Sequence, residues 1–559
     1  MKPLSLLFSL LVFSASAMQA QTIDVVVAVD VQTDRHPISP LIYGVNNSAN
    51  PAANLGSRRQ GGDRYTTYNW ENNASNSGHW TDDPLLDHIS DALLTGYVPS
   101  SEPAKAITDF HDVSIAQGTY SLVTLQAGHV ARDINGVVGP AEAIPNLSRW
   151  RAVAFRKGDP FSPMPDVNDG AVFMDELVNF LVDRYGPASS TTGIKGYGIS
   201  NEPGLWRQTH PRCHPVKEGY RDIFEATTGL AAAIKDVDPS AEVFGGVTFG
   251  FSEMEDFQGV PDKGDFAEYR WYIDALLATI KQASDMQGRR LMDVLDIHWY
   301  SEAEGETPYE PVAWSGNDPD LAAARVQAPR SLWDSTYVEK SWITGDPGRF
   351  SHSDLVFGTK AIMLIPHLLQ SIATYNPGTK LAFGEFGYGG YDHISGGLAT
   401  ADVLGVFGRH GVYYANQWDD IAGYIESAYR LYRNYDGAGS TFGDTSVRCA
   451  TSDIGNSSVY ASVDPAGALH ILAINKNADT MLTMNITITG GSFENGEAWL
   501  FDGSGRVVRR GEDVVVAGTT LTYRAPSFSA SHIVLPPRGS SSVPTDTDIL
   551  KLWLAQGPE

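Results

Sequence analysis

The stretch GYGISNEP at residues 196–203 places a glutamate, Glu202, just after an apolar run typical of a β-strand. The stretch KLAFGEFGYGG at residues 380–390 places Glu385 at the end of a second such run. The two glutamates are 183 positions apart (385 minus 202), which leaves room for several strand–helix units between them. In a closed barrel of parallel strands, the carboxyl ends of the strands meet on one face. We therefore expect Glu202 and Glu385 to face each other across a cleft at that end of a barrel.

The order of elements around these stretches predicts an α/β fold. Strand-like and helix-like runs alternate from about residue 40 to about 430, which is typical of parallel strands with helical connections. Amphipathic helices are predicted at 173–185 and 269–283. Eight strands are expected, the number that closes a (β/α)8 TIM barrel. They are residues 42–46, 57–61, 121–126, 198–201, 243–247, 294–298, 381–384 and 414–418.

Two long stretches without a clear pattern interrupt this alternation. The first runs from residue 65 to about 100, after the second strand, and the other from 301 to about 350, after the sixth. Loops of this length inside a compact domain are usually functional. We expect both to form walls of the cleft.

A second, smaller domain is predicted after residue 440. Short strand-like runs separated by Asn, Asp and Gly are typical of an antiparallel β-sandwich. These runs are residues 459–463, 468–474, 482–488 and 497–501. The early run 23–29 is also strand-like, and we expect it to cross over and join the sandwich. The predicted organisation is a signal peptide at 1–20, an N-terminal strand at 21–39, the barrel at 40–435, the sandwich at 436–537 and a linker-like tail at 538–559.

The charge of the chain limits its partners. The 559 residues carry a formal net charge of −26. Nucleic acids and anionic membranes bind clustered Lys and Arg, so this charge argues against both as partners. It suits a soluble protein that acts on a neutral polymer, although solubility alone also explains it. We expect a monomer.

The N-terminus predicts export. The basic start is followed by an apolar run at 4–17 and by small residues, with cleavage expected after Ala17 or Ala20. No later run is long and apolar enough to span a bilayer. The chain has two cysteines, Cys213 and Cys449. An exported protein can bridge them, which would tie the two domains together, and two buried thiols are the alternative.

Paired carboxylates across a cleft are the basic equipment for cleaving a glycosidic bond. Each glutamate by itself could be an ordinary polar residue at a strand end. Two such sites, both with aromatic and glycine-rich neighbours, favour the catalytic interpretation. The 12 Trp and 24 Tyr of the chain are consistent with it, because aromatic faces stack on sugar rings, although most aromatic residues in any protein are core.

Four stretches carry a resemblance to a known family. GGDRYTTYNWENNASNSGHW at 61–80 strongly resembles the loop after the second strand in glycoside hydrolase family 44. ISNEP at 199–203, PRSLWDSTYVE at 329–339 and RNYDGAGSTFGDTS at 433–446 match as well. The resemblance covers roughly residues 22–537 and implies an endoglucanase or xyloglucanase with a (β/α)8 barrel and a β-sandwich. Gln60 after Arg59, and Phe386–Gly387 after Glu385, depart from the family pattern and concern substrate preference.

The resemblance implies that Glu202 is the general acid/base and Glu385 the nucleophile. The acid must hold its proton at working pH, so its site must raise its pKa by desolvation or by a nearby like charge. We expect the negative charge of Glu385 to do this. When Glu385 is esterified by sugar the repulsion disappears, and Glu202 can then act as a base.

Further roles follow from the same resemblance. Asn201 is expected to hydrogen-bond the sugar 2-hydroxyl, with a turn residue as the alternative. Tyr300 is expected to donate a hydrogen bond to the nucleophile, and His298 to line the same site, with packing at the barrel mouth as the alternative. Arg59 is expected to keep Glu385 ionised through charge-assisted hydrogen bonds, with a structural salt bridge as the alternative.

Aromatic residues are candidates for contact with sugar rings. Trp418, at the last strand end, is the leading candidate for a platform at the cleavage site. The weaker candidates are Trp70, Trp80, Trp206, Trp299 and Tyr388, each of which could equally be core. Asp63, Glu71 and Asp419 are polar candidates for the cleft without an assigned role.

These observations predict a secreted, retaining endo-β-1,4-glucanase that acts on cellulose-like, mixed-linkage and xyloglucan-like β-glucans. The alternatives are a related retaining barrel hydrolase for mannan or xylan, and a catalytically inactive glycan-binding protein. No cofactor and no catalytic metal are expected, and a structural calcium ion is left open.

Overall fold

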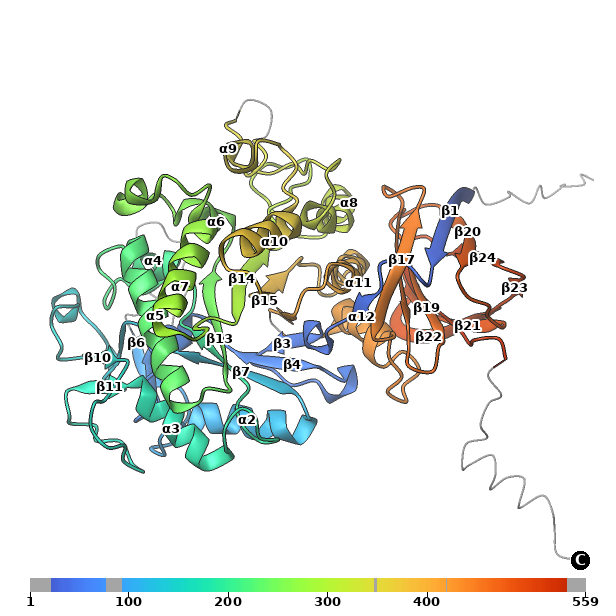
Figure 1. Cartoon of the computed structure of the whole chain (residues 1–559). Coiled ribbons are helices and arrows are strands. Elements are labelled where there is room, and N and C mark those ends of the chain that lie inside the picture. Colours follow the sequence, from blue (N-terminus) through green and yellow to red (C-terminus); the bar gives the residue numbers. More distant parts are fainter. Residues whose placement is uncertain (1–21, 77–92, 346–348, 419, 540–559) are drawn as a thin grey trace, which may run out of the picture.

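The computed structural model describes residues 22–76, 93–345, 349–418 and 420–539. It has two lobes, a barrel with surrounding helices and a domain of β-strands (Figure 1). Eight strands close the barrel, and each overlaps one of the predicted strands, so the predicted (β/α)8 barrel is confirmed. In chain order they are β3 (Gly44–Asn46), β4 (Ser57–Gln60), β7 (Tyr120–Leu125), β12 (Gly196–Ile199), β13 (Glu242–Thr248), β14 (Val294–Tyr300), β15 (Lys380–Gly387) and β16 (Tyr414–Gln417).

Helices follow the barrel strands and cover their outer faces. Only a short 3₁₀ turn, η2 (Pro51–Ala53), lies between the first two barrel strands. The longer helices are α2 (Lys105–Gln117), α3 (Met174–Tyr185), α5 (Tyr220–Val237), α7 (Tyr272–Gln287), α10 (Leu364–Tyr375), α11 (Ile394–Arg409) and α12 (Gly423–Arg433). Among the helices of the described ranges, none is long and apolar enough to cross a membrane.

An apolar layer fills the barrel at the end away from the two glutamates. It takes one buried side chain from each of five strands: Leu122, Phe244, Val294, Ala382 and Tyr414. Such layers make the barrel interior a packed core. The polar side chains at the other end therefore stand on a rigid base.

Insertions build up the barrel mouth. The one after β4 holds β5 (Ala74–Asn76) and β6 (Leu93–Gly96), which form a small sheet with β9 (Gly136–Val137). The one after β14 holds α8 (Pro319–Gln327) and α9 (His352–Phe357). A third insertion, after β7, was not predicted. It forms a sheet of β8 (His129–Ala131), β10 (Trp150–Ala154) and β11 (Ala171–Phe173), whose strands are too short to give a clear sequence pattern.

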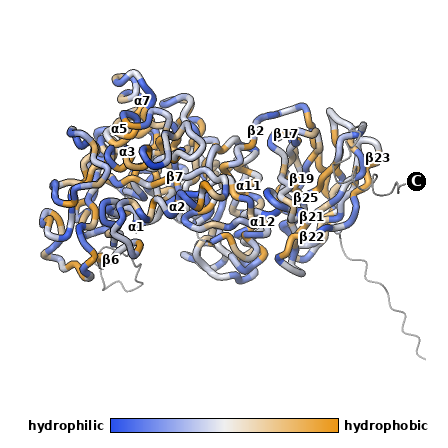
Figure 2. The backbone as a smooth tube through the Cα atoms, turned by 90° about the horizontal axis from the view of Figure 1, so that it is seen from below, coloured by the Kyte–Doolittle hydropathy of each residue, from blue (hydrophilic) through white to orange (hydrophobic). Residues whose placement is uncertain are grey.

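The second domain is a β-sandwich, as predicted. Its strands follow one path that encloses a single apolar core, and Figure 2 shows hydrophobic strand segments inside this domain. The strands are β1 (Thr22–Asp30), β17 (Thr445–Thr451), β18 (Ser457–Val463), β19 (Leu469–Asn475), β20 (Met481–Thr489), β21 (Gly496–Asp502), β22 (Gly505–Val514), β23 (Val516–Ala517), β24 (Thr520–Ala525) and β25 (Ser529–Leu535). The short β2 (His36–Pro37) pairs with β17 at its edge.

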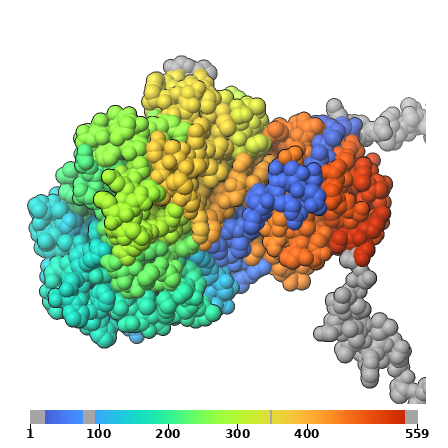
Figure 3. Space-filling view, viewed as in Figure 1, coloured from blue at the N-terminus to red at the C-terminus, as the bar shows by residue number. Residues whose placement is uncertain are grey.

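The first described strand belongs to this second domain. β1 pairs in parallel with β20 and antiparallel with β17. Val25, Val27 and Val29 are buried, whereas Val26 is 58% exposed, because alternate side chains of a strand point to opposite faces. The chain then crosses the sandwich surface before it enters the barrel (Figure 3).

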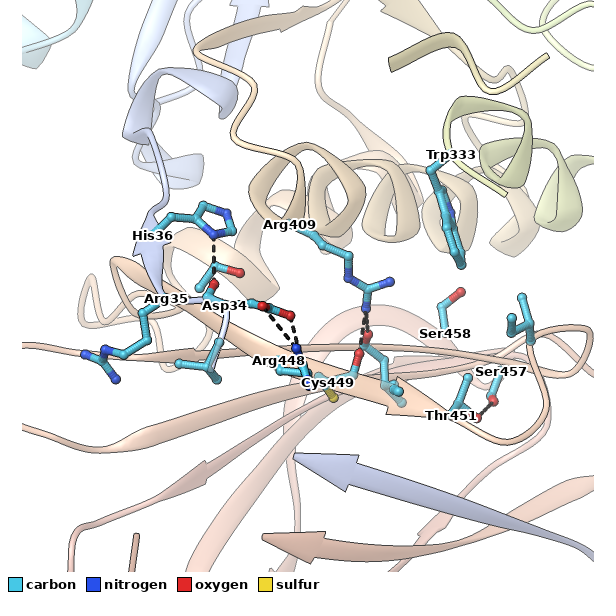
Figure 4. Close-up of a pocket in the computed structure, with 15 residues that line it drawn as sticks. Asp34, Arg35, His36, Trp333, Arg409, Arg448, Cys449, Thr451, Ser457 and Ser458 are labelled. Atoms are coloured by element: carbon cyan, nitrogen blue, oxygen red, sulfur yellow. Dashed lines mark hydrogen bonds and ion pairs between the residues drawn. The ribbon is translucent and has the colours of Figure 1, made fainter. Parts of the chain in front are cut away.

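Buried contacts join the two domains through α11. Asp402 accepts a hydrogen bond from the Tyr460 hydroxyl at 2.5 Å and forms an ion pair with Lys476 at 2.8 Å. Gly405 lets the helix approach the sheet, since an added Cβ would lie 2.3 Å from the Tyr460 ring. At the end of the helix, Arg409 donates hydrogen bonds to the carbonyl oxygens of Cys449 and Val459 (Figure 4). The sandwich is therefore part of the barrel's support.

The two cysteines are buried in different places. Cys213 lies in a small cluster beside the insertions at the barrel mouth, with its Sγ 3.7 Å from the carbonyl oxygen of His210. Cys449 lies in the sandwich core, where burial raises its pKa to about 12. No disulfide joins these two residues, so the structure favours the buried-thiol alternative. The predicted signal peptide and residues 540–559 of the predicted tail lie outside the described residues.

Candidate active site

Strand ends place the principal polar side chains in the barrel mouth. Arg59 lies on β4, His298 and Tyr300 on β14, and Glu385 on β15. His298 and Tyr300 are two positions apart, so both point to the same side of their strand. His298 is directly beside Glu385 in the register of β14 and β15. The parallel strands thus deliver these four side chains to one place.

Glu385 is held by two donors. Its Oε1 accepts a hydrogen bond from Nη1 of Arg59 at 2.6 Å, and its Oε2 accepts one from the Tyr300 hydroxyl at 2.6 Å. The Glu385 side chain is 4% exposed and that of Arg59 is 1% exposed. Charge-assisted hydrogen bonds in such a dry site are strong and fix the orientation of both partners. The carboxylate is thereby fixed in position and supplied with a counter-charge.

Glu202 has a different environment. It follows β12 with φ 43° and ψ 59°, and its backbone N–H donates to the carbonyl oxygen of Val247 at 3.0 Å. A left-handed conformation in a residue other than glycine costs on the order of 1–3 kcal/mol and is held by its surroundings. Burial raises the pKa of Glu202 to about 7, and the positive charge of Arg59 partly opposes the rise. We expected repulsion by Glu385 to raise this pKa, and the structure instead gives burial as the main cause.

His298 supports this state of Glu202. Its Nδ1 lies 2.7 Å from Oε1 of Glu202 and 3.5 Å from Oε2 of Glu385. Burial lowers the pKa of His298 to about 3, so the imidazole is neutral near pH 7. A neutral ring can share a hydrogen bond with Glu202 without adding the positive charge that would lower its pKa.

Asn201 lies between the two sides of the site. Its Oδ1 accepts a hydrogen bond from Nη2 of Arg59 at 2.8 Å, and its Nδ2 donates to Oδ1 of Asp63 at 3.4 Å. Burial, and then the carboxylates of Glu202 and Glu385, raise the pKa of Asp63 well above its usual value. Asp63 is therefore a third carboxyl group in the cleft, which the sequence marked only as a polar candidate.

The two glutamates are close together. One oxygen of Glu202, one oxygen of Glu385 and one ring nitrogen of His298 all lie within 4.8 Å of one another. The three could in principle ligate a metal ion. However, the buried guanidinium of Arg59 already supplies positive charge beside Glu385 and would repel a second cation.

These groups open into a pocket of about 610 Å³. Aromatic side chains form much of its wall, and two of them, Trp314 and Trp342, lie in the insertion after β14 and were not predicted as site residues. The Trp314 ring packs against Tyr300 with centroids 4.6 Å apart and is 60% exposed. The full lining is Gly62, Asp63, Glu202, Leu205, Phe249, Gly250, Phe251, Tyr300, Glu302, Trp314, Trp342, Glu385 and Trp418.

Trp418 lines this pocket beside Gly62. Gly62 has φ +98°, which favours glycine, and an added Cβ there would lie 2.8 Å from the indole ring. We expect Trp418→Ala to lower kcat/KM on oligosaccharides roughly thirtyfold, about 2 kcal/mol of lost contact with the sugar, with little change in thermal unfolding. Trp299→Ala is the matched control: that indole is 1% exposed, and its loss should lower the free energy of unfolding by about 3–5 kcal/mol. Kinetics beside thermal melts separates the two, and a collapse of the melting temperature in Trp418→Ala would assign this residue to the core.

The structure favours the core alternative for several candidate contact residues, whose side chains are buried and do not line the pocket. Trp70 is fully buried and packs on Phe180 with centroids 5.7 Å apart. Tyr388 is 1% exposed within the main core. The other buried candidates are Trp206, whose Nε1 donates to the carbonyl oxygen of Asn201 at 2.7 Å, Trp299, and Glu71, which pairs with Arg151 at 2.6 Å. Trp80 and Asp419 lie outside the described residues.

The two glutamates line the same pocket but have different environments. Glu202 can carry a proton near neutral pH, whereas Glu385 is bound by a cation and a phenol. Two carboxyl groups with such different environments are the pattern of an acid and a nucleophile in a glycosidase.

Comparisons with known proteins agree with this chemistry. A model of glycoside hydrolase family 44 matches residues 66–303. A protein named endoglucanase A from Paenibacillus lautus is 45% identical over 549 residues, which cover 96% of this chain and 75% of that protein. A protein named beta-mannanase/endoglucanase A from Caldicellulosiruptor saccharolyticus is 42% identical over 520 residues, 91% of this chain and 38% of that protein.

A solved structure shows the same fold. It is a Paenibacillus polymyxa xyloglucanase from glycoside hydrolase family 44 with xyloglucan, 41% identical, with a TM-score of 0.84 over 92% of this chain and 99% of that chain. The barrel, the sandwich and the extent of these matches lead to one conclusion: this chain belongs to glycoside hydrolase family 44.

Proposed function

We propose that this protein is an endo-acting β-1,4-glucanase that cleaves cellulose-like, mixed-linkage and xyloglucan-like β-glucans with retention of configuration. The observation that carries the proposal is the pair of Glu202, with a pKa of about 7, and Glu385, bound by Arg59 and Tyr300. The similar proteins described above are named as an endoglucanase, a mannanase/endoglucanase and a xyloglucanase, which supports the substrate class.

The mechanism has two steps. In the first, Glu385 attacks the anomeric carbon while Glu202 gives its proton to the departing glycosidic oxygen, so a C–O ester bond forms as the glycosidic bond breaks. In the second, Glu202 takes a proton from water, the water oxygen bonds to the anomeric carbon, and the ester bond to Glu385 breaks. We propose that Asn201 holds the sugar 2-hydroxyl and that Arg59 and Tyr300 receive the charge that returns to Glu385.

A panel of soluble polysaccharides tests the substrate class. Reducing ends should appear with barley-type mixed-linkage glucan, carboxymethyl cellulose and xyloglucan, with a rapid fall in viscosity that marks internal cleavage. Faster release from mannan or xylan would support the alternative enzyme. No release from any of them, with retained binding, would support the inactive glycan-binding protein.

Retention of configuration has its own prediction. One carboxylate oxygen of Glu202 lies within 4.8 Å of one carboxylate oxygen of Glu385. This closeness supports a retaining mechanism, in which Glu385 attacks the anomeric carbon itself and no room is needed for a water molecule between the two carboxyl groups. Proton NMR in the first minutes of hydrolysis should show the β-anomer first. An α-anomer first would instead make Glu385 a base that activates water.

We propose that the chemistry needs no cofactor and that a calcium ion, where bound, is structural. Glu304 Oε2 and Glu339 Oε1, in the insertion after β14, are buried with no hydrogen-bond partner among the described residues. Burial raises the pKa of Glu339 to about 7; hydrogen bonds to Ser331 and Ser341 oppose the rise, and the charges of Glu302 and Glu304 add to it. Calcium prefers such oxygen ligands.

Metal removal tests this assignment. Chelation should lower the melting temperature by a few degrees, because a ligand bound only to the folded state stabilises it, while kcat at 25 °C stays unchanged. Glu339→Gln should abolish the effect of added calcium on the melting temperature. Loss of kcat on chelation would make the metal catalytic, and an unchanged melting temperature would remove calcium from this site.

We also propose that the protein is secreted and monomeric, with no nucleic acid or membrane partner. The signal-like N-terminus and the net charge of −26 support this. Light scattering on the purified chain, and N-terminal sequencing of protein from culture medium, test it. A dimer mass, or a retained leader, would overturn the corresponding part.

A further inference from the structure

Glu253 is a buried carboxylate beside the acid/base loop to which the mechanism above gives no role. It lies on α6 (Phe251–Asp256), just after β13, and is fully buried. Its Oε1 accepts a hydrogen bond from the backbone N–H of Gly204 at 3.1 Å, and its Oε2 accepts one from the backbone N–H of Phe249 at 2.8 Å. One side chain therefore bridges the backbone after β12 and the backbone after β13.

Both bridged segments contain unusual backbone. After β12, Ser200 has φ 57° and Glu202 has φ 43°. In β13, a bulge interrupts the register with β14 between Gly246 and Thr248, and Val247 has φ 43°, which is rare for a β-branched residue. The two segments also contact each other directly, through the hydrogen bond from Glu202 N–H to Val247. Strained backbone of this kind persists only where the surroundings fix it.

Gly204 shows how closely the carboxylate and the loop approach each other. An added Cβ at this residue would lie 2.7 Å from Cδ of Glu253. Burial raises the pKa of Glu253, and the N–H groups of Phe249 and Gly204 oppose that rise. Lys217, Tyr272 and Glu202 are the other titratable groups that interact with it. The contact between Glu253 and the loop at Gly204 is therefore close, polar and buried from solvent.

We propose that Glu253 is a positioning residue for the acid/base: its carboxylate clamps the loop after β12 to the loop after β13 and so holds Glu202 in the conformation that reaches His298. This inference rests on the proposed role of Glu202 as proton donor. Displacing a catalytic group by about 1 Å can cost on the order of a hundredfold in rate, so a clamp two residues from Glu202 bears directly on proton transfer.

Glu253→Gln is the test, and Glu255→Gln is its matched control. Glu255 lies on the same helix, is 7% exposed and pairs at 2.8 Å with His352, which belongs to the insertion after β14. The Glu253→Gln change keeps the shape of the side chain, but it replaces one carboxylate oxygen, which accepts a hydrogen bond from a backbone N–H, with an amide NH₂ group, which can only donate. Each variant is compared with the unchanged protein on two substrates, cellotetraose and 2,4-dinitrophenyl β-cellobioside. The dinitrophenolate leaves without a proton, whereas the sugar of cellotetraose needs one.

The expected result separates positioning from stability. Glu253→Gln should lower kcat/KM for cellotetraose roughly 10- to 100-fold, within the range of general acid catalysis, and change it less than about twofold for the activated substrate. Glu255→Gln should change both less than about twofold. Active enzyme is counted with a 2-fluoro cellobioside that traps the nucleophile, so partial unfolding does not enter the ratio. Should Glu253→Gln not fold, Glu253→Asp is measured in the same way.

Equal losses on both substrates, or no loss on cellotetraose, would overturn the inference and leave Glu253 a structural residue. A different result would contradict the proposed function: the protein without any substitution would hydrolyse no β-glucan.

Discussion

Glu385→Gln should lower kcat on a soluble β-glucan by at least about 10⁴-fold, the largest effect expected in this protein. An amide cannot form the ester intermediate, so both chemical steps are lost. The change is nearly isosteric, and Arg59 keeps its hydrogen bonds to Asn46 at 2.9 Å and Asn201 at 2.8 Å. The fold should therefore survive, and calorimetry should show oligosaccharide binding by the variant.

Glu242→Gln is the control for this prediction. Glu242 opens β13 at the opposite end of the barrel, where it accepts hydrogen bonds from the Tyr120 and Tyr413 hydroxyls at 2.8 and 2.7 Å. Residues at that end of a barrel contribute to stability rather than chemistry, so kcat should stay within about twofold while the melting temperature falls. Near-normal turnover by Glu385→Gln would remove Glu385 from the mechanism and leave the family resemblance without a nucleophile.

The sequence predicted those parts of the site that follow from strand order. Arg59, His298, Tyr300 and Glu385 are strand residues, and closure of a parallel barrel brings the carboxyl ends of its strands together. Glu202 is close enough to the end of β12 that barrel closure also brings it to this face. For these residues, a correct prediction of the strands is nearly enough to predict where their side chains lie in the site.

Loop residues do not follow the same rule. Trp70 and Tyr388 lie outside regular strands, and the direction of their side chains is set by packing among distant segments that no local pattern reveals. Trp314 and Trp342 were missed for the same reason, because they lie in a long insertion without periodicity. Glu253 has no motif around it, and only the approach of two loops shows what it contacts.

The main cause of the raised pKa of Glu202 could not be predicted from the sequence either. A like charge was the visible candidate, because Glu385 could be placed nearby from strand order. The degree of burial could not be foreseen, since it depends on His298 and the surrounding loops. Burial turned out to be the larger cause.

Glu202→Gln should have the second-largest effect, a loss of about 10²–10⁴-fold in kcat/KM on unactivated glucans. The loss should be far smaller for the first step with a dinitrophenyl glycoside, whose leaving group needs no proton. The second step should remain slow, since no base activates water, and azide, which needs no base, should restore turnover. A loss that is equal for both leaving groups would contradict the role of proton donor.

The pH dependence gives an independent check on Glu202. The acid must be protonated to act, and its pKa is about 7, so kcat/KM of the unchanged protein should be high below that pH and fall tenfold per unit above it. In Glu202→Gln this basic limb should disappear. Its persistence near pH 7 would assign the proton to another group, and Asp63 is the candidate, because its pKa is also raised and it faces the same cleft. Asp63→Asn decides between the two: if Glu202 is the acid, this variant keeps the basic limb, whereas a limb lost with Asp63 would transfer the role.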